Sequence, residues 1–307
     1  MNHHDAFLTE VTDGVFAWIQ PDGSWWLNNT GAISTTDGVV LVDTCATEPR
    51  TRALLDAVDR ATGGRPIVSA INTHAHGDHT YGNSVLPENT VIIGHENTRE
   101  ALLEDTVIDG CPPFWNPVPD WGHVTRRPPL VTTRDGLTLH HGGHRIEVCH
   151  PGGTAHTTGD LAVWLPEPRV LFTGDLLFHG VTPLVLSGSI EGALKSLDWI
   201  AGFDPSHVVP GHGTLIDAGA LPAALDTHRR YYQLVLDRAR SGLHEGLTPL
   251  AAARLAPLGE FAALPDSERI VLNLHRVYAD LTGKPLDIRQ AWGDALTLNG
   301  APMTTHV

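Results

Sequence analysis

The chain has 307 residues, of which 41% are hydrophobic and 18% are charged, a composition typical of a soluble globular protein. Its net charge is −15 with histidine neutral, and no run of lysine and arginine exceeds two residues, which disfavours binding to nucleic acid or to an anionic membrane. No apolar stretch approaches the roughly 18 residues of a membrane span, and the N-terminus lacks a basic segment followed by an apolar core, so we expect a cytoplasmic protein without a secretory signal.

The first part of the chain predicts strands with intervening helices. Apolar runs bounded by turn residues indicate strands at 15–19, 25–33, 39–43, 67–73 and 91–93. Apolar residues at helical spacing predict helices over 51–61, which ends at Gly63-Gly64, and over about 95–105.

From Leu130 onward the pattern changes to a β-meander. Strands are expected at 137–139, 145–148, 161–165 and 169–173, followed by a helix over 189–203 and a last strand at 206–209. Strands dominate two stretches of the chain, and each stretch closes with a helix. The sequence therefore predicts two sheets with helices on their outer faces, a four-layer αββα sandwich over residues 1–217.

Beyond Asp217 the sequence is that of a helical extension, residues 218–307. A helix is expected between Asp266, as its N-cap, and Gly283, as its stop. Its apolar stripe is formed by Ile270, Leu274, Val277 and Leu281. We expect the extension to pack on the sandwich or on a second subunit in a homodimer.

The most informative motif is the run 74–79, His-Ala-His-Gly-Asp-His, which directly follows the predicted strand 67–73. Imidazole nitrogen and carboxylate oxygen are the ligands of a borderline cation such as Zn²⁺. In a tightly turning loop, His74 and His76 point to one side, while Asp78 and His79 reach a second point nearby. One short loop can therefore serve two metals.

Three further candidate ligands stand in glycine-containing turns or at strand ends. His156 lies in the segment 150–160, Asp175 ends the segment 170–175, and His212 lies in the segment 208–214. Turns at strand ends are a common way for a rigid scaffold to present functional side chains. Together with the run 74–79 they form a candidate metal site.

These motifs resemble those of the metallo-β-lactamase-fold hydrolase superfamily over about residues 10–216. The resemblance implies two metal sites that share one bridging ligand: His74, His76 and His156 for the first, Asp78, His79 and His212 for the second, and Asp175 between them. An aspartate at the bridging position resembles the hydrolase, lactonase and glyoxalase II-like branches. The β-lactamases with a cysteine ligand are a poorer match.

The chemistry of such a site is that of a metal-dependent hydrolase. Two divalent cations about 3.5–4 Å apart lower the pKa of a shared water, so that a bridging hydroxide exists at pH 7 and attacks an acyl carbonyl. We expect two cations per chain, for which Zn²⁺ suits the histidines and Fe or Mn also fit, and we expect Asp78 and Asp175 to be the catalytic carboxylates. The chain has no G-x-S-x-G nucleophile elbow.

Two apolar segments are candidates for the walls of a substrate pocket. One is the proline- and tryptophan-rich segment 111–121, and the other is the segment 176–184 that follows the bridging aspartate. We expect Trp115, Trp121, Phe178 and His179 to line the pocket. For the tryptophans, packing at the surface is the alternative.

The closest subgroup by resemblance is the metallo-β-lactamase-like cyclase/thioesterase of aromatic polyketide pathways, of the actinorhodin type. The chain is similar to it in the segments 72–74, 77–79, 163–166, 181–183, 187–189, 247–250 and 273–276. The resemblance implies that a thioester of an aromatic acyl group, presented on an acyl carrier protein, is hydrolysed. Whether ring closure accompanies hydrolysis is left open.

Two alternatives remain open at this point. One is a lactone, β-lactam or glutathione-thioester hydrolase of the same fold; glutathione would need a basic patch for its carboxylates, for which Arg126-Arg127 is the candidate. The other is a non-catalytic metal-binding or sensor protein. Metal content separates the second alternative from an enzyme, since about two metals per chain support hydrolysis.

Overall fold

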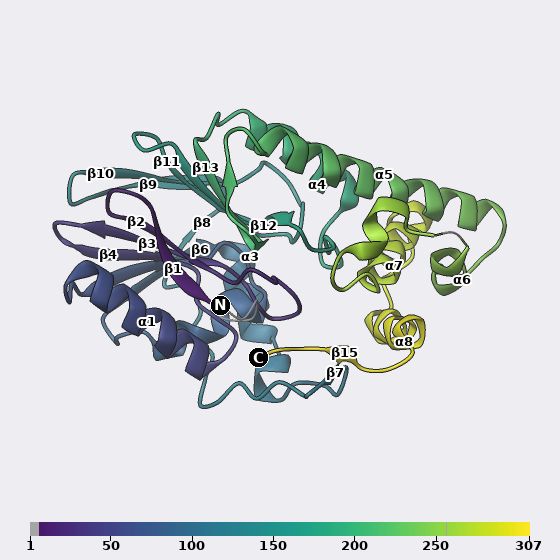
Figure 1. Ribbon diagram of the computed structural model, residues 1–307. Coiled ribbons are helices and arrows are strands. Elements are labelled where there is room, and N and C mark those ends of the chain that lie inside the picture. The colour runs from purple at the N-terminus through teal and green to yellow at the C-terminus, as the bar shows by residue number, and fades with distance from the viewer. Residues whose placement is uncertain (1–5, 256) are drawn as a thin grey trace.

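Two β-sheets face each other, and helices cover their outer faces (Figure 1). The computed structural model describes residues 6–255 and 257–307, so residues 1–5 of the first predicted domain lie outside the described part of the chain. The arrangement confirms the αββα sandwich with a helical C-terminal part that the order of strands and helices predicts.

The first sheet has seven strands in the order β1-β2-β3-β4-β5-β6-β8. Their bounds are β1 (Phe7–Thr12), β2 (Val15–Ile19), β3 (Thr30–Thr35), β4 (Gly38–Val42), β5 (Ile67–Ile71), β6 (Val91–His95) and β8 (Val131–Thr133). On the outer face lie α1 (Glu48–Thr62) and α3 (Glu96–Glu104). Because β4, β5 and β6 run parallel, their carboxyl ends meet at one edge of the sheet.

The second sheet has six strands in the order β14-β13-β12-β11-β10-β9. Their bounds are β9 (Gly136–His141), β10 (His144–Cys149), β11 (Ala162–Leu165), β12 (Val170–His179), β13 (His207–Gly213) and β14 (Ile216–Asp217). Strands β12 and β13 are parallel, so the segments that carry Asp175 and His212 lie side by side. The helices α4 (Ile190–Ala201) and α5 (Leu221–His244) cover this sheet.

Aliphatic side chains fill the space between the sheets, as alternating burial in strands requires. Ile33, Val40 and Ile71 come from the first sheet, and Val148, Phe172 and Val209 from the second. Gly31 allows the sheets to approach, because a Cβ atom at this position would lie 2.3 Å from the Phe172 ring. The two sheets therefore form one core.

A few of the predicted helix and strand boundaries differ from those in the structure. The expected strand 25–33 begins only at Thr30, because residues 24–29 form a turn that the Asn29 side chain ties to the carbonyl groups of Pro210 and Gly213. Strand β1 was not expected at all. Asp266 is not a helix N-cap: helix α7 begins at Arg269, with which Asp266 forms an ion pair.

The C-terminal part is helical, as expected, and it packs on the sandwich. After α5 come α6 (Pro249–Arg254), α7 (Arg269–Thr282), which ends at Gly283 in the left-handed region, and α8 (Ile288–Asn299). Buried side chains of α5 and α7 belong to the same core as those of β12 and α4. The final strand β15 (Met303–Thr304) pairs with β7 (Trp115–Asn116), which returns the C-terminus to the first half of the chain.

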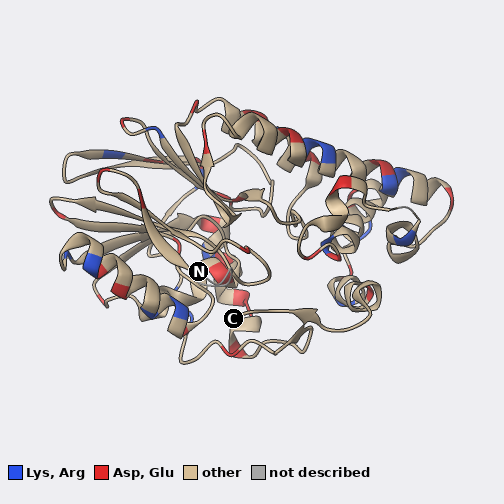
Figure 2. Cartoon of the chain, viewed as in Figure 1, with Lys and Arg blue, Asp and Glu red and all other residues tan. Residues whose placement is uncertain are grey.

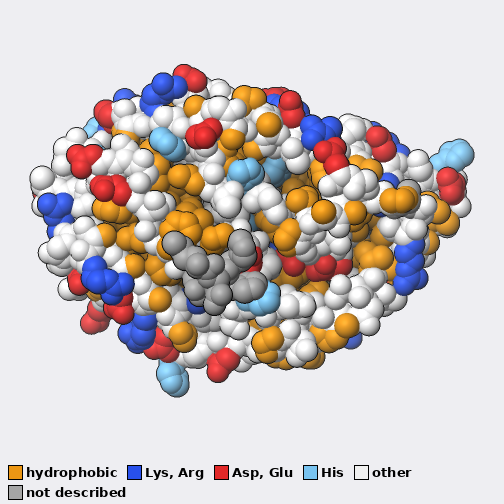
Figure 3. Space-filling model, in the orientation of Figure 1, with side chains coloured by type: hydrophobic (Ala, Val, Ile, Leu, Met, Phe, Trp, Pro, Cys, Tyr) orange, Lys and Arg blue, Asp and Glu red, His pale blue; other side chains and the backbone are white. Residues whose placement is uncertain are grey.

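Both acidic and basic residues occur along helices such as α1 and α5 (Figure 2). On the face drawn in Figure 3, most Lys and Arg side chains lie near the rim, and hydrophobic side chains gather towards the middle. Within the described residues, no helix combines the length and the apolar character needed to cross a membrane.

Arg269, at the start of α7, links the helical part to two loops of the sandwich. It is 2% exposed, its guanidinium lies 4.3 Å from the centroid of the Trp25 ring, and it donates to the Thr182 carbonyl at 2.9 Å. The neighbouring Glu268 accepts a hydrogen bond from the Trp25 indole at 2.6 Å. The segments around residues 25 and 182 are therefore held by the same helix end.

Replacing Arg269 with Met should lower the free energy of unfolding by up to about 3–5 kcal/mol, because the largely buried Asp266 carboxylate, whose side chain is 11% exposed, loses its ion-pair partner. Chemical denaturation measures this change. Arg289→Met, at an exposed position of α8, is the matched control and should change stability little. Adding Asp266→Asn to Arg269→Met should restore part of the loss; a double variant less stable than the single one would contradict the ion-pair explanation.

Candidate metal centre

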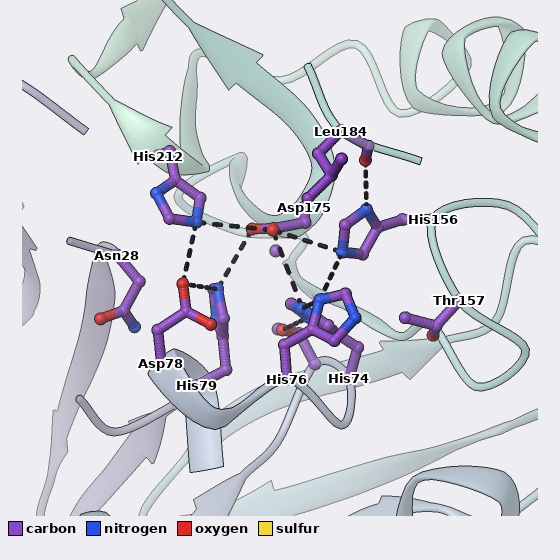
Figure 4. A network of polar contacts seen from close by, with 12 residues as sticks. Asn28, His74, His76, Asp78, His79, His156, Thr157, Asp175, Leu184 and His212 are labelled. Carbon is purple, nitrogen blue, oxygen red and sulfur yellow. Dashed lines mark hydrogen bonds and ion pairs between the residues drawn. The ribbon is translucent and has the colours of Figure 1, made fainter. Parts of the chain in front are cut away.

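The run 74–79 bends sharply where β5 ends. After Ile71 the chain turns into the one-turn helix α2 (Gly77–Thr80) and then into the 3-10 helix η1 (Tyr81–Val85). Gly77 is needed in this bend, because a Cβ atom there would lie 2.3 Å from the Tyr81 ring. The bend points the side chains of the motif towards the second sheet, where they meet those of His156, Asp175 and His212 (Figure 4).

The first group of candidate ligands consists of His74, His76, His156 and Asp175. His76 Nδ1 lies 3.2 Å from His74 Nε2 and 2.9 Å from His156 Nε2. Asp175 Oδ2 lies 3.3 Å from His156 Nε2 and 3.8 Å from His74 Nε2. Three ring nitrogens and one carboxylate oxygen thus surround one point.

The second group consists of Asp78, His79 and His212, and Asp175 adjoins it as well. His212 Nε2 lies 3.2 Å from Asp78 Oδ2, and His79 Nε2 lies 3.1 Å from Asp175 Oδ1. Gly211 allows this approach of β13 to β12, because a Cβ atom there would lie 2.0 Å from Asp175 Oδ1. The structure therefore brings together all seven predicted ligands, in the two predicted groups, with Asp175 between them.

The polar atoms of the cluster fit divalent cations. Apart from their 3.1 Å contact with each other, His79 Nε2 and Asp175 Oδ1 are buried and have no hydrogen-bond partner among the described residues. Buried polar atoms in folded proteins are rarely left in this state, so such atoms indicate an ion or water. Histidine nitrogens and carboxylate oxygens are the donors that Zn²⁺, Fe and Mn accept.

The protonation states differ between the two groups. Burial lowers the pKa of His74 well below its usual range and that of His156 to about 3, so both imidazoles are neutral, which is the metal-binding form. Burial also disfavours charge on His212, but Asp175 and Asp78 outweigh it and raise the pKa of His212 to about 9. A cation bound by the second group would replace such protons.

Four of the histidine ligands are oriented by contacts through their other ring nitrogen. His156 Nδ1 lies 2.8 Å from the Leu184 carbonyl, and His212 Nδ1 lies 3.0 Å from the Gly23 carbonyl. His74 Nδ1 lies 3.0 Å from the hydroxyl of Thr73. Such contacts select the tautomer and the ring orientation of a metal ligand.

Asp43 orients the fourth, His79, and the sequence analysis did not single it out. Its Oδ2 lies 2.8 Å from His79 Nδ1, and its Oδ1 accepts a hydrogen bond from the Thr73 backbone at 2.7 Å. Asp43 has a φ of 63°, a strained conformation for a residue other than glycine. The available signal was its position: it ends the strand predicted over 39–43, and strand β4 neighbours strand β5, which leads into the histidine motif.

The four predicted pocket residues lie in two places. Phe178 is next to the cluster, where its ring stacks on His212 at a centroid distance of 5.4 Å, and His179 follows it. Trp115 and Trp121 are 3% and 5% exposed and pack against Trp26. The two tryptophans are therefore members of a buried aromatic cluster around Trp26. Their contact with substrate stays a prediction.

A sequence model described as the metallo-beta-lactamase superfamily matches residues 23–212. The metallo-beta-lactamase type 2 of Bacillus cereus is 30% identical over 209 residues, which are 65% of this chain and 72% of the relative. The α subunit of 2,4-dinitroanisole O-demethylase of Nocardioides sp. (strain JS1661) is 27% identical over 235 residues, or 76% of this chain, but this match spans only 63% of the subunit's length.

The chain is also similar to a further sequence relative and to a solved structure. The hydroxyacylglutathione hydrolase of Rhizobium meliloti (strain 1021) is 27% identical over 169 residues, which are 53% of this chain and 54% of the relative. The structure of the inverting sec-alkylsulfatase Pisa1 from Pseudomonas sp. superimposes with a TM-score of 0.69 at 19% identity and covers 93% of this chain and 51% of the sulfatase. At this identity the likeness concerns the fold.

The purified chain should contain about two divalent metal ions, because two groups of ligands share Asp175. Replacing His156 with Ala removes a ligand of the first group and should lower the metal content to about one ion per chain. Elemental analysis after gel filtration measures the ratio. The control is His244→Ala, at the exposed end of α5. Equal metal content in both variants would contradict the assignment.

Asp43→Asn should weaken metal binding by about ten- to a hundred-fold, because His79 loses the carboxylate that orients its ring. Titration against a chelator of known affinity measures the change. Asp56→Asn, on the exposed face of α1, should bind metal as the unmodified chain does. An affinity unchanged in Asp43→Asn would show that the His79 ring is held without the carboxylate.

Proposed function

The chain belongs to the metallo-β-lactamase superfamily, and we propose that it is a hydrolase that uses two divalent cations, zinc in our proposal, to cleave an acyl thioester. The observation that carries the proposal is the pair of buried ligand groups on either side of Asp175. When bound in such a site, two cations lower the pKa of water and polarise an acyl carbonyl.

The residues of the site divide the remaining work. Asp175 contacts both ligand groups and would hold two like charges close together by offsetting their repulsion. Burial disfavours ionisation of Asp78, but His79 and His212 outweigh this effect and lower its pKa to about 2, so its carboxylate is ionised at neutral pH. We therefore propose Asp78 and Asp175 as the catalytic carboxylates.

A thioester suits this site because its leaving group is a thiolate. A cysteine thiol has a pKa of about 8.5, and thiols in general are far more acidic than alcohols, so a thiolate can leave with little need for a general acid. The similarity to hydroxyacylglutathione hydrolase supports the same class of bond by that relative's name. A lactone or a β-lactam remains the alternative substrate class within the family, and the metallo-beta-lactamase relative favours it.

Glutathione is a poor candidate for the thiol part of the substrate. The two arginines that could bind its carboxylates are engaged within the protein: Arg126 pairs with Asp109, and Arg127 donates to backbone carbonyls of residues 83–90. We therefore favour an acyl group carried on another thiol, such as that of an acyl carrier protein. An aromatic polyketide acyl group, with or without ring closure, is the specific substrate that we propose.

The metal-loaded enzyme should hydrolyse aromatic acyl thioesters, and Asp175→Ala should lower kcat/KM by at least about a hundred-fold, because the carboxylate shared by both ligand groups is lost. Thiol release, followed with a chromogenic disulfide, measures turnover. Asp56→Ala, at an exposed position of α1, is the matched control. A full complement of metal without turnover of thioesters, lactones or β-lactams would instead favour the metal-binding or sensor alternative.

A further inference from the structure

A cavity of about 300 Å³ lies between the end of β12 and helix α5. Six of its lining residues define its shape: Phe178, Val181, Ala224, His228, Tyr231 and Phe261. Phe178, His228 and Tyr231 are buried, whereas His179 and Gly180 on one side and Ala223 on the other are more exposed. The cavity therefore reaches from the surface into the junction of the sandwich and the helical part.

Phe178 is the wall between this cavity and the candidate metal centre. Its ring stacks on His212 at 5.4 Å with an interplanar angle of 15°, and on its other neighbour His228 at 6.4 Å with an angle of 22°. The centroid of the His156 ring lies 5.9 Å from that of the same Phe178 ring, with an interplanar angle of 63°. One aromatic ring thus separates a ligand of each metal group from the cavity.

The lining carries no charged side chain, and its buried polar atoms are already paired. His228 Nε2 accepts a hydrogen bond from the Phe178 backbone, and its Nδ1 donates to the Ala224 carbonyl. Burial lowers the pKa of His228 to about 4, so the ring is neutral at pH 7. The Tyr231 hydroxyl accepts a hydrogen bond from Asn273. A charged ligand would find no partner here, whereas an apolar group would lose nothing by entering.

We propose that this cavity binds the apolar end of the acyl substrate and that Phe178 determines which acyl groups fit. The inference rests on the proposed thioester hydrolase function and deepens it. An acyl group with its carbonyl at the candidate metal centre would pass Phe178 and enter beside His179, the last residue of the strand that carries Asp175, and Gly180, which follows that strand. Small residues at the start of α5 leave this room: Ala220, just before the helix, and Ala223 and Ala224 in its first turn.

The volume limits the size of the group. Ligand pockets begin at roughly 300 Å³, which suits one or two aromatic rings or a medium-length acyl chain better than a large polycycle. Aromatic acyl thioesters with one or two rings should therefore gain most from the cavity, and acetyl thioesters should not reach it.

The kinetic test uses the metal-loaded enzyme and N-acetylcysteamine thioesters of acetate, benzoate and 2-naphthoate. Ala224→Phe fills the cavity, and Ala223→Trp narrows its mouth from an exposed position, where folding is little affected. Both should lower kcat/KM for the naphthoyl ester by about ten- to a hundred-fold, and for the acetyl ester by less than about two-fold. Ala53→Phe, at an exposed position of α1, is the control. Equal losses on all esters would overturn the proposal.

A second measurement does not depend on turnover. Binding of 2-naphthol to the metal-loaded enzyme, followed by its fluorescence, should be weakened about ten-fold or more in both cavity variants and unchanged in Ala53→Phe. Unchanged binding in the cavity variants would overturn the cavity as an apolar site. If the unmodified enzyme hydrolyses none of the thioesters, the proposed function and the acyl assignment both fail, and the naphthol result alone decides whether the cavity binds apolar ligands.

Discussion

The burial of Asp175 among four imidazoles is the constraint on which the rest of this structure depends. A buried carboxylate is unfavourable unless it is paired, and here it contacts side chains of both ligand groups. Those side chains come from both sheets, so the two halves of the sandwich must meet in one register. Gly31 permits the approach of the two sheets, because a Cβ atom there would collide with the Phe172 ring, and Gly211 permits the approach of β13 to Asp175 in the neighbouring strand β12.

A second layer of contacts explains why loops of little regular structure are held in place. The Gly23 carbonyl accepts a hydrogen bond from His212 Nδ1, and the Leu184 carbonyl accepts one from His156 Nδ1. Both segments are in turn linked to the start of α7, through Trp25 and Thr182, by Glu268 and Arg269. The helical extension therefore holds the two loops that orient His212 and His156, although none of the candidate metal ligands lies in it.

The same helical extension forms one wall of the cavity next to Phe178. Helix α5 lies beside the end of β12, and its small residues leave a cavity next to Phe178. A shared fold can host different substrates when the elements that cover its site differ, and we propose that such a covering element selects the acyl group here. For this protein the covering element is its own C-terminal part.

The sequence by itself determined most strands and helices of the sandwich and the candidate ligands within the run 74–79, because these depend on local periodicity and spacing. The division of all seven candidate ligands into two groups was implied by the family resemblance. His156, Asp175 and His212 were predictable because each stands at or after the end of a predicted strand, although strand β12 continues beyond Asp175 to His179. Only the tertiary structure revealed Asp43, the boundary of strand β3 and the burial of Trp115. Each of these depends on a neighbour distant in the chain: His79, the carbonyl groups of β13, and Trp26. A local sequence pattern does not contain information on such long-range contacts. These contacts determine which side chains face the candidate metal centre.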